Sequence, residues 1–174
     1  MANQNWAALL NAPSQLVTAT TFTGTSITDV SPPPDFSFAA GALTPGTILR
    51  VEVVGAFVSS SGATTLTVQL MYGGTGGTSL WTSGAVTLTT SAGNPFHIEG
   101  IIRILTAGTA GTAAVYVEQH GISTTANAAT LVTTRSASVG SINTTTSNSL
   151  IVAATAGVAL TSFNVDTFTI EQLN

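Results

Sequence analysis

The stretch Ile48–Val58, which reads ILRVEVVGAFV, decides the fold class of this 174-residue chain. Polar Arg50 and Glu52 occupy one set of alternate positions, and apolar side chains occupy the other set. These apolar residues are Leu49, Val51, Val53 and Phe57. A period of two predicts a β-strand that buries one face. Gly55, inside this strand, indicates a bulge or a close approach of neighbouring backbone.

Most of the remaining chain has the same texture, because runs of Val, Ile, Leu and Thr are separated by Gly, Pro, Ser and Asn turns. We expect further strands at 16–22, 36–38, 64–72, 94–106, 113–120, 130–136, 150–156 and 163–173. Strands of this length and spacing predict an all-β sandwich or barrel. The proline run at 31–35 is expected to carry the chain between sheets, since proline lacks a backbone donor for a sheet ladder.

The N-terminal segment differs from the rest of the chain. Trp6, Leu9 and Leu10 are spaced as i, i+3 and i+4, which predicts one face of a short helix that ends before Pro13. This segment either packs on its own domain or docks as an arm on a neighbouring subunit. We therefore divide the chain into an N-terminal arm at 1–15 and a sandwich domain at 16–174.

The composition argues against several functional classes. Only 6% of the residues are charged, against about 25% in an ordinary soluble domain. Three arginines, no lysine and a net charge of −4 argue against a nucleic-acid or membrane partner. The absence of cysteine excludes disulfides and thiolate metal sites. The first residues lack the pattern of a secretory signal, so we expect synthesis in a cytoplasm.

The segments 94–106 and 113–120 are expected to form a hairpin that carries the one polar constellation of the chain. The predicted register pairs Ile104 with Val115 and Ile102 with Val117, and it places Ile98 on the same buried face. It also places Glu99 opposite His120, Ile101 opposite Glu118 and Arg103 opposite Tyr116. The outer face would then carry His97, Glu99, Arg103, Tyr116, Glu118 and His120.

This outer face has several interpretations. We favour a ladder of cross-strand charge pairs, in which facing opposite charges stabilise the sheet by roughly 0.2–1 kcal/mol each. A metal site built from His97, Glu99, Glu118 and His120, or acid–base catalysis by a His–Glu pair, is the enzymatic alternative. We predict no catalytic residue, no bound metal and no cofactor. The glycine-rich segment 73–77 lacks the lysine and the following helix of a phosphate-binding loop, so it is interpreted as a connection.

Several segments together resemble a known group of proteins. They are Pro32–Phe38 (PPPDFSF), Gly46–Val51 (GTILRV), Leu70–Thr75 (LMYGGT), Phe96–Gly100 (FHIEG) and Phe168–Asn174 (FTIEQLN). In order and texture the chain from about residue 16 to its end is similar to small jelly-roll virion proteins of tailed bacteriophages, of the capsid decoration (cement) or head-fibre group.

The resemblance implies a two-sheet antiparallel jelly-roll sandwich without enzymatic residues. It implies a homotrimer on the outer surface of the virion capsid that binds the major capsid protein, with Trp6, Leu9 and Leu10 as candidate contact residues. The alternative is a tail or appendage module that binds host glycan. Trp81, Tyr72 and Tyr116 are the aromatic candidates for a sugar platform in that case.

Overall fold

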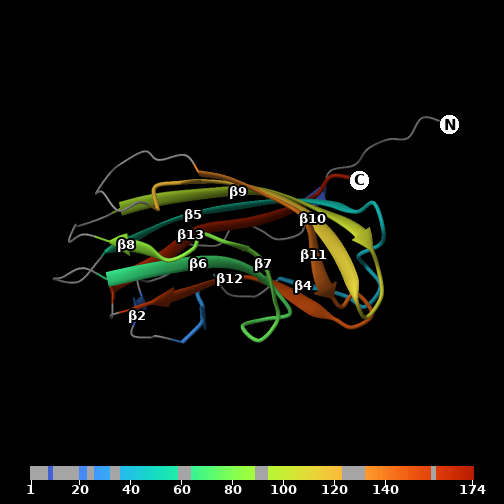
Figure 1. Ribbon diagram of the computed structural model, residues 1–174, viewed down its shortest axis with the longest axis horizontal. Helices are drawn as coiled ribbons and strands as arrows, with labels where there is room; N and C mark the ends of the chain where they lie inside the picture. The colour runs from blue at the N-terminus through green and yellow to red at the C-terminus, as the bar shows by residue number, and fades with distance from the viewer. Residues whose placement is uncertain are drawn as a thin grey trace.

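The computed structural model contains two antiparallel sheets that pack face to face (Figure 1). It describes residues 8–9, 20–22, 26–31, 36–58, 64–88, 94–122, 132–157 and 160–174. All regular elements within these ranges are strands, numbered β1 to β13 in chain order. The prediction of an all-β sandwich is therefore confirmed.

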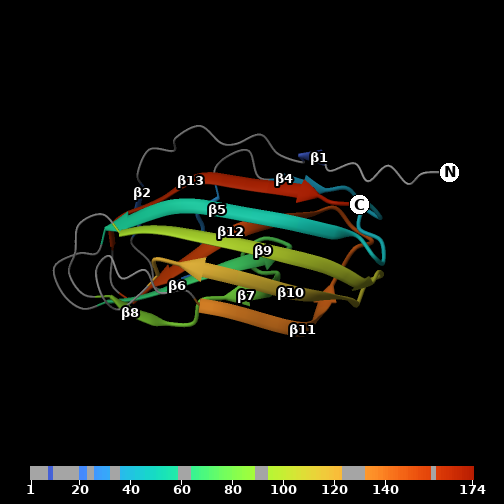
Figure 2. The same cartoon turned by 90° about the horizontal axis from the view of Figure 1, so that it is seen from above.

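The larger sheet, which we call sheet A, has the order β1-β13-β5-β9-β10-β11, and β2 also pairs with β13. Figure 2 shows β13, β5, β9, β10 and β11 side by side. The bounds are β1 Ala8–Leu9, β2 Thr20–Phe22, β5 Ile48–Val58, β9 Asn94–Thr106, β10 Gly111–His120, β11 Val132–Ile142 and β13 Leu160–Gln172. The predicted bounds of 48–58 and 94–106 are confirmed.

The smaller sheet, sheet B, has the order β3-β12-β6-β7, with β4 paired to β12 and β8 paired to β6. Its strands are β3 Thr28–Asp29, β4 Phe36–Phe38, β6 Thr64–Tyr72, β7 Thr78–Thr82, β8 Val86–Leu88 and β12 Asn148–Ala156. The strands β3, β7 and β8 are absent from the sequence-based prediction. The proline run lies outside the described residues, apart from Ser31.

The hydrophobic core lies between the two sheets, because alternate side chains of each strand point inward. Val51, Ile98 and Val117 of sheet A and Val68 and Val152 of sheet B have no exposed surface. The rings of Phe57, Phe96 and Phe163 form an aromatic group within this core. Small branched side chains suit this arrangement, since they fill the space between pleated sheets.

Gly55 occupies a place where no side chain fits. A Cβ atom there would lie 2.2 Å from the backbone oxygen of Asn164 and 2.7 Å from the Phe96 ring. The facing strand β13 has a register shift between Val165 and Thr167, opposite this position. The expectation of a close backbone approach at Gly55 is confirmed.

The N-terminal helix prediction is wrong at the two arm residues that the structure describes. Ala8 and Leu9 form strand β1 and pair with Gln172 and Glu171 of the same chain. An isolated helix of so few residues is unstable in water, whereas the edge of β13 supplies ready backbone partners. Trp6 and Leu10 lie outside the described residues.

The β9–β10 hairpin has a different register from the predicted one. The structure pairs Ile104 with Ala113, Ile102 with Val115 and Gly100 with Val117, a shift of two residues. The predicted oppositions of Glu99 to His120, Ile101 to Glu118 and Arg103 to Tyr116 are therefore wrong. A β-bulge between Thr112 and Ala113 contributes to the displacement. The predicted inward residues Ile98, Ile102, Ile104, Val115 and Val117 are all buried, because a shift of two preserves the faces.

Candidate functional site

Ionisable side chains gather on the outer face of sheet A, the surface turned away from the core. Besides the Tyr116 phenol, and Asp166 at the register shift of β13, the alternating burial of the strands and their register place nine acidic, basic or imidazole side chains on this face. They are Arg50, Glu52, His97, Glu99, Arg103, Glu118, His120, Arg135 and Glu171. All six residues of the sequence-predicted polar face are brought together here. The new members come from β5, β11 and β13, whose pairing the hairpin pattern did not reveal.

Three glutamates form one row across the middle of this face. The register pairs Glu52 of β5 with Glu99 of β9, and Glu99 with Glu118 of β10. Like charges directly opposite one another destabilise a sheet, so this row needs compensation. Arg50 supplies part of it, at 2.9 Å from Glu99 and 3.9 Å from Glu171. Within the hairpin, Glu99 and Glu118 thus face each other as like charges, and the cross-strand pairs of opposite charge join Arg50 of β5 to Glu99 and Glu171.

The two histidines lie directly opposite each other beside this row. The rings of His97 and His120 stack with their centres 6.0 Å apart, and His97 Nε2 lies 3.2 Å from the Glu52 carboxylate. This geometry pairs imidazole with imidazole, whereas the predicted register paired Glu99 with His120. Within the part of the chain that the structure describes, no group of three or more His, Asp or Glu side chains is arranged to hold a metal ion.

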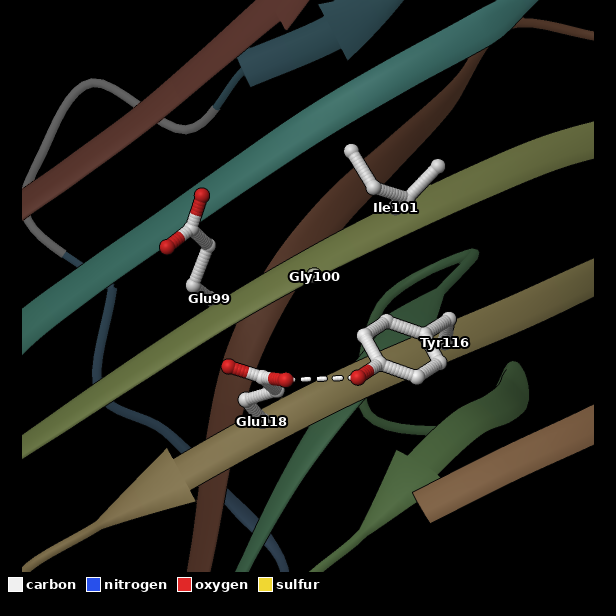
Figure 3. A pocket seen from close by; sticks show the side chains of 5 residues that line it. All are labelled: Glu99, Gly100, Ile101, Tyr116 and Glu118. Carbon is white, nitrogen blue, oxygen red and sulfur yellow. Dashed lines mark hydrogen bonds between the residues drawn. The ribbon is translucent and has the colours of Figure 1, made fainter. Parts of the chain in front are cut away.

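A shallow hollow of about 170 Å³ lies on the same face (Figure 3). Its walls are the side chains of Glu99, Ile101, Tyr116 and Glu118, and the backbone of Gly100 contributes to its lining. The Tyr116 hydroxyl donates a 2.5 Å hydrogen bond to the Glu118 carboxylate. This bond raises the pKa of the Tyr116 phenol, because loss of the proton would set a second negative charge beside Glu118.

A second hollow of about 310 Å³ lies beside the glycine-rich loop. The Tyr72 hydroxyl donates to the backbone oxygen of Asn143 at 3.1 Å, and Asn148 donates to the same oxygen at 2.8 Å. Burial raises the pKa of the Tyr72 phenol, and the side-chain hydrogen bond with Asn148 lowers it in part. Gly73 and Gly74 have φ angles of 93° and 75°, which explains the glycines as turn residues.

The aromatic candidates for a sugar platform differ in their exposure. Trp81 and Tyr72 are each only 5% exposed and belong to the core between the sheets. Tyr116 is 40% exposed on the outer face of sheet A. The structure thus leaves one of the three rings available to a ligand or a partner.

The candidate contact residues of the N-terminal arm are only partly placed. Leu9 lies in β1 at the edge of sheet A, and its backbone pairs with Glu171. Trp6 and Leu10 lie outside the described residues. The structural description thus places Leu9 on its own domain and gives no further test of the docking role.

Comparisons with known proteins give no assignment. No family model matches the chain, no curated protein matches it, and no solved structure matches its fold. Among the described segments, no helix is long and apolar enough to span a membrane.

Proposed function

We propose that this protein is a structural subunit that associates with copies of itself and with a larger assembly, without catalysing a reaction. The finer proposal is a homotrimer of jelly-roll sandwiches on the outer surface of a bacteriophage capsid. There it binds the major capsid protein and reinforces the shell as a decoration, or cement, protein. It would be synthesised in the cytoplasm of the bacterial host and need no cofactor, nucleic acid or membrane.

The observation that supports this proposal is the neutral outer face of sheet B. Asp29 is the one charged side chain within the described strands of sheet B. Around a small buried cluster of Met71, Ile151 and Ala153, the outward positions carry hydroxyl and amide side chains: Thr65, Thr67, Gln69, Ser79, Thr82, Ser149 and Thr155. Covering such a face with another protein leaves no charge buried without a partner, so the desolvation cost is low. We propose that this face meets the capsid.

The shape of the molecule is compatible with a role in packing. The two hollows described above are shallow, and neither brings titratable groups into an enclosed cleft of the kind that most enzymes use. A small rigid sandwich can add contact area at the seams of a shell, and repetition over many symmetric sites multiplies a modest energy per site.

The proposal is tested with the full chain and with phage capsids assembled without it. Light scattering should give a mass near three times 17.5 kDa, and the protein should sediment with the shells and raise the temperature at which they break open. Thr65→Glu and Gln69→Glu should each weaken binding, because they place a charge on the neutral face. A protein that stays in the supernatant at micromolar concentration would reject the capsid role. If the protein binds the capsids but does not raise their heat resistance, the reinforcing role is rejected and the capsid-binding role is kept.

A further inference from the structure

The outer face of sheet A has two halves of opposite charge along the strand direction. The glutamate half carries the row Glu52, Glu99 and Glu118. The arginine half carries Arg103, four residues beyond Glu99 on β9, together with Arg50 and Arg135, which pair with Ile101 and Tyr116. Ile101 and Tyr116, which face each other, thus have the glutamate row on one side and Arg103 on the other. Arg50, with its partner Glu171, and Arg135 lie at the two ends of their own row.

The ion pairs within the chain leave charge uncompensated in both halves. Arg50 binds Glu99 and Glu171, and His97 lies beside Glu52. Glu118 receives a hydrogen bond from the neutral Tyr116 hydroxyl. Across the described ranges, no ion pair involves Glu118, Arg103 or Arg135. The charge of Glu118 is therefore met only by a neutral hydroxyl, and within the described ranges the guanidinium groups of Arg103 and Arg135 have no acidic partner.

The sheet geometry keeps Arg103 away from Glu118 in one molecule. Arg103 pairs with Ala114, which lies four residues before Glu118 on β10. At about 3.4 Å per residue, this places the two positions roughly 13 Å apart along the strands. An ion pair between these residues therefore requires a second molecule.

We propose that the outer face of sheet A is the contact between copies of this chain, with the glutamate half of one copy against the arginine half of the next. This inference rests on the self-association in the proposed function and names its surface. Arg103 meets Glu118 of the neighbouring copy, and Tyr116 and Ile101 fill the centre. Tyrosine and arginine are the residue types that most often dominate binding energy when they are buried at the middle of an interface.

The dimensions of the face suit such a contact. Five strands at about 4.8 Å spacing and ten residues at about 3.4 Å give a flat area of roughly 800 Å² on each copy. A specific association of standard size buries about 800 Å² per partner. Two arrangements satisfy both halves: a two-fold pair uses the whole face in one contact of this size, and a closed ring of three copies uses one half, roughly 400 Å², in each of its contacts.

A charge-reversal cycle tests the contact. Arg103→Glu and Glu118→Arg should each raise the concentration needed for assembly at least tenfold, since each places like charges together. The double variant Arg103→Glu/Glu118→Arg keeps the wild-type net charge and should recover at least half of the loss on a logarithmic scale. Sedimentation equilibrium measures these constants, and circular dichroism confirms that each variant is folded. Gln69→Glu, a charge added to sheet B, serves as the matched control and should leave the assembly unchanged.

The possible outcomes separate this inference from the proposed function. If either single charge reversal leaves the assembly constant unchanged, or if the double variant does not restore it, the proposed contact is wrong. The protein would still be a self-associating structural subunit in that case. A wild-type chain that is monomeric at every concentration and salt would overturn both. If the wild-type protein is a dimer that both single reversals weaken and the double variant restores, the contact is supported and the trimer is rejected.

Discussion

The outer faces of sheets A and B differ in chemistry although both sheets are built from similar strands. Sheet A carries nine acidic, basic or imidazole side chains and the Tyr116 phenol on its outer face, whereas the outward positions of β6, β7 and β12 in sheet B carry no ionisable side chain. The sequence spreads its few charges over the whole length of the chain. The pairing of β5, β9, β10, β11 and β13 collects most of them on one surface. A charge-poor protein can therefore still present one strongly charged face.

The two faces also differ in how far their apolar residues are covered. Ile151 of β12 points outward from sheet B, yet it has no exposed surface and packs with Met71 and Ala153 in a small cluster of its own. Ile101 of β9 occupies a comparable outward position on sheet A and remains partly exposed. The apolar side chains at the centre of the neutral face are thus buried within the chain itself. At the centre of the charged face, Ile101 is still partly exposed and is accessible to a partner.

Truncation of these two isoleucines should give the largest difference between the faces. We expect Ile151→Ala to lower the free energy of unfolding by about 2–5 kcal/mol, because it removes fully buried methyl groups. Ile101→Ala should cost less than about 1 kcal/mol in the isolated protein, since its site is already solvated. Urea unfolding at low protein concentration measures both values. Equal losses would show that the two faces do not differ in coverage.

Removal of the arginine that offsets the glutamate row should have a smaller effect. Arg50→Gln takes away the partner of Glu99 and Glu171, and we expect a loss of up to about 1 kcal/mol, because the pairs are partly exposed. Salt should reduce this loss through screening. The comparison variant Gln69→Glu adds a charge to sheet B. A loss for Arg50→Gln that does not depend on salt would contradict an electrostatic origin.

Relief of the like-charge row should stabilise the sheet slightly. Glu118→Gln removes one of two directly opposed carboxylates and keeps an oxygen that can accept from the Tyr116 hydroxyl. We expect a gain of about 0.2–1 kcal/mol in the free energy of unfolding at low salt. Thermal unfolding at several salt concentrations tests it, and a destabilised variant would show that the row is compensated in some other way.

The two tyrosines should give the smallest effect, at alkaline pH. The folded-state pKa values of Tyr72 and Tyr116 are raised above 10.0, Tyr72 mainly by burial and Tyr116 mainly by its bond to Glu118. A raised pKa means that the unfolded state loses its proton first, so stability is full below pH 10 and falls as the pH rises above it. Tyr116→Phe should remove only the contribution from the charged face. An ultraviolet titration in which either phenol ionises below the value of free tyrosine would contradict this prediction.

The long strands could be predicted from the sequence, and so could the short strand β4 at Phe36–Phe38, but the other short strands could not. The bounds of β5, β6 and β9 agree with the prediction because each has at least nine residues with steady alternation. Strand β7 was missed because Leu80 and Trp81 are consecutive and both buried, next to a register shift between Leu70 and Met71. Strands β3 and β8 have only two and three residues and lack the two aromatic side chains that mark β4.

The membership of the polar face could be predicted for the hairpin but its arrangement could not. His97, Glu99, Arg103, Tyr116, Glu118 and His120 share a face in the predicted register and in the observed one. The two registers differ by two residues, and both bury the same isoleucines and valines. Hydrophobic patterning therefore cannot distinguish them. The register shift after Thr112, together with the pairing of β9 to β5 and of β10 to β11, accompanies the register in which Glu99 meets Glu118.

The sequence alone determined that this chain forms strands, which side chains point inward and that charge is scarce, because alternation with a period of two is a local property. The tertiary structure decided which strands are neighbours and which rows face each other, because these depend on long-range backbone pairing and on bulges. The glutamate row, the histidine pair and the separation of a charged from a neutral face all belong to this second level.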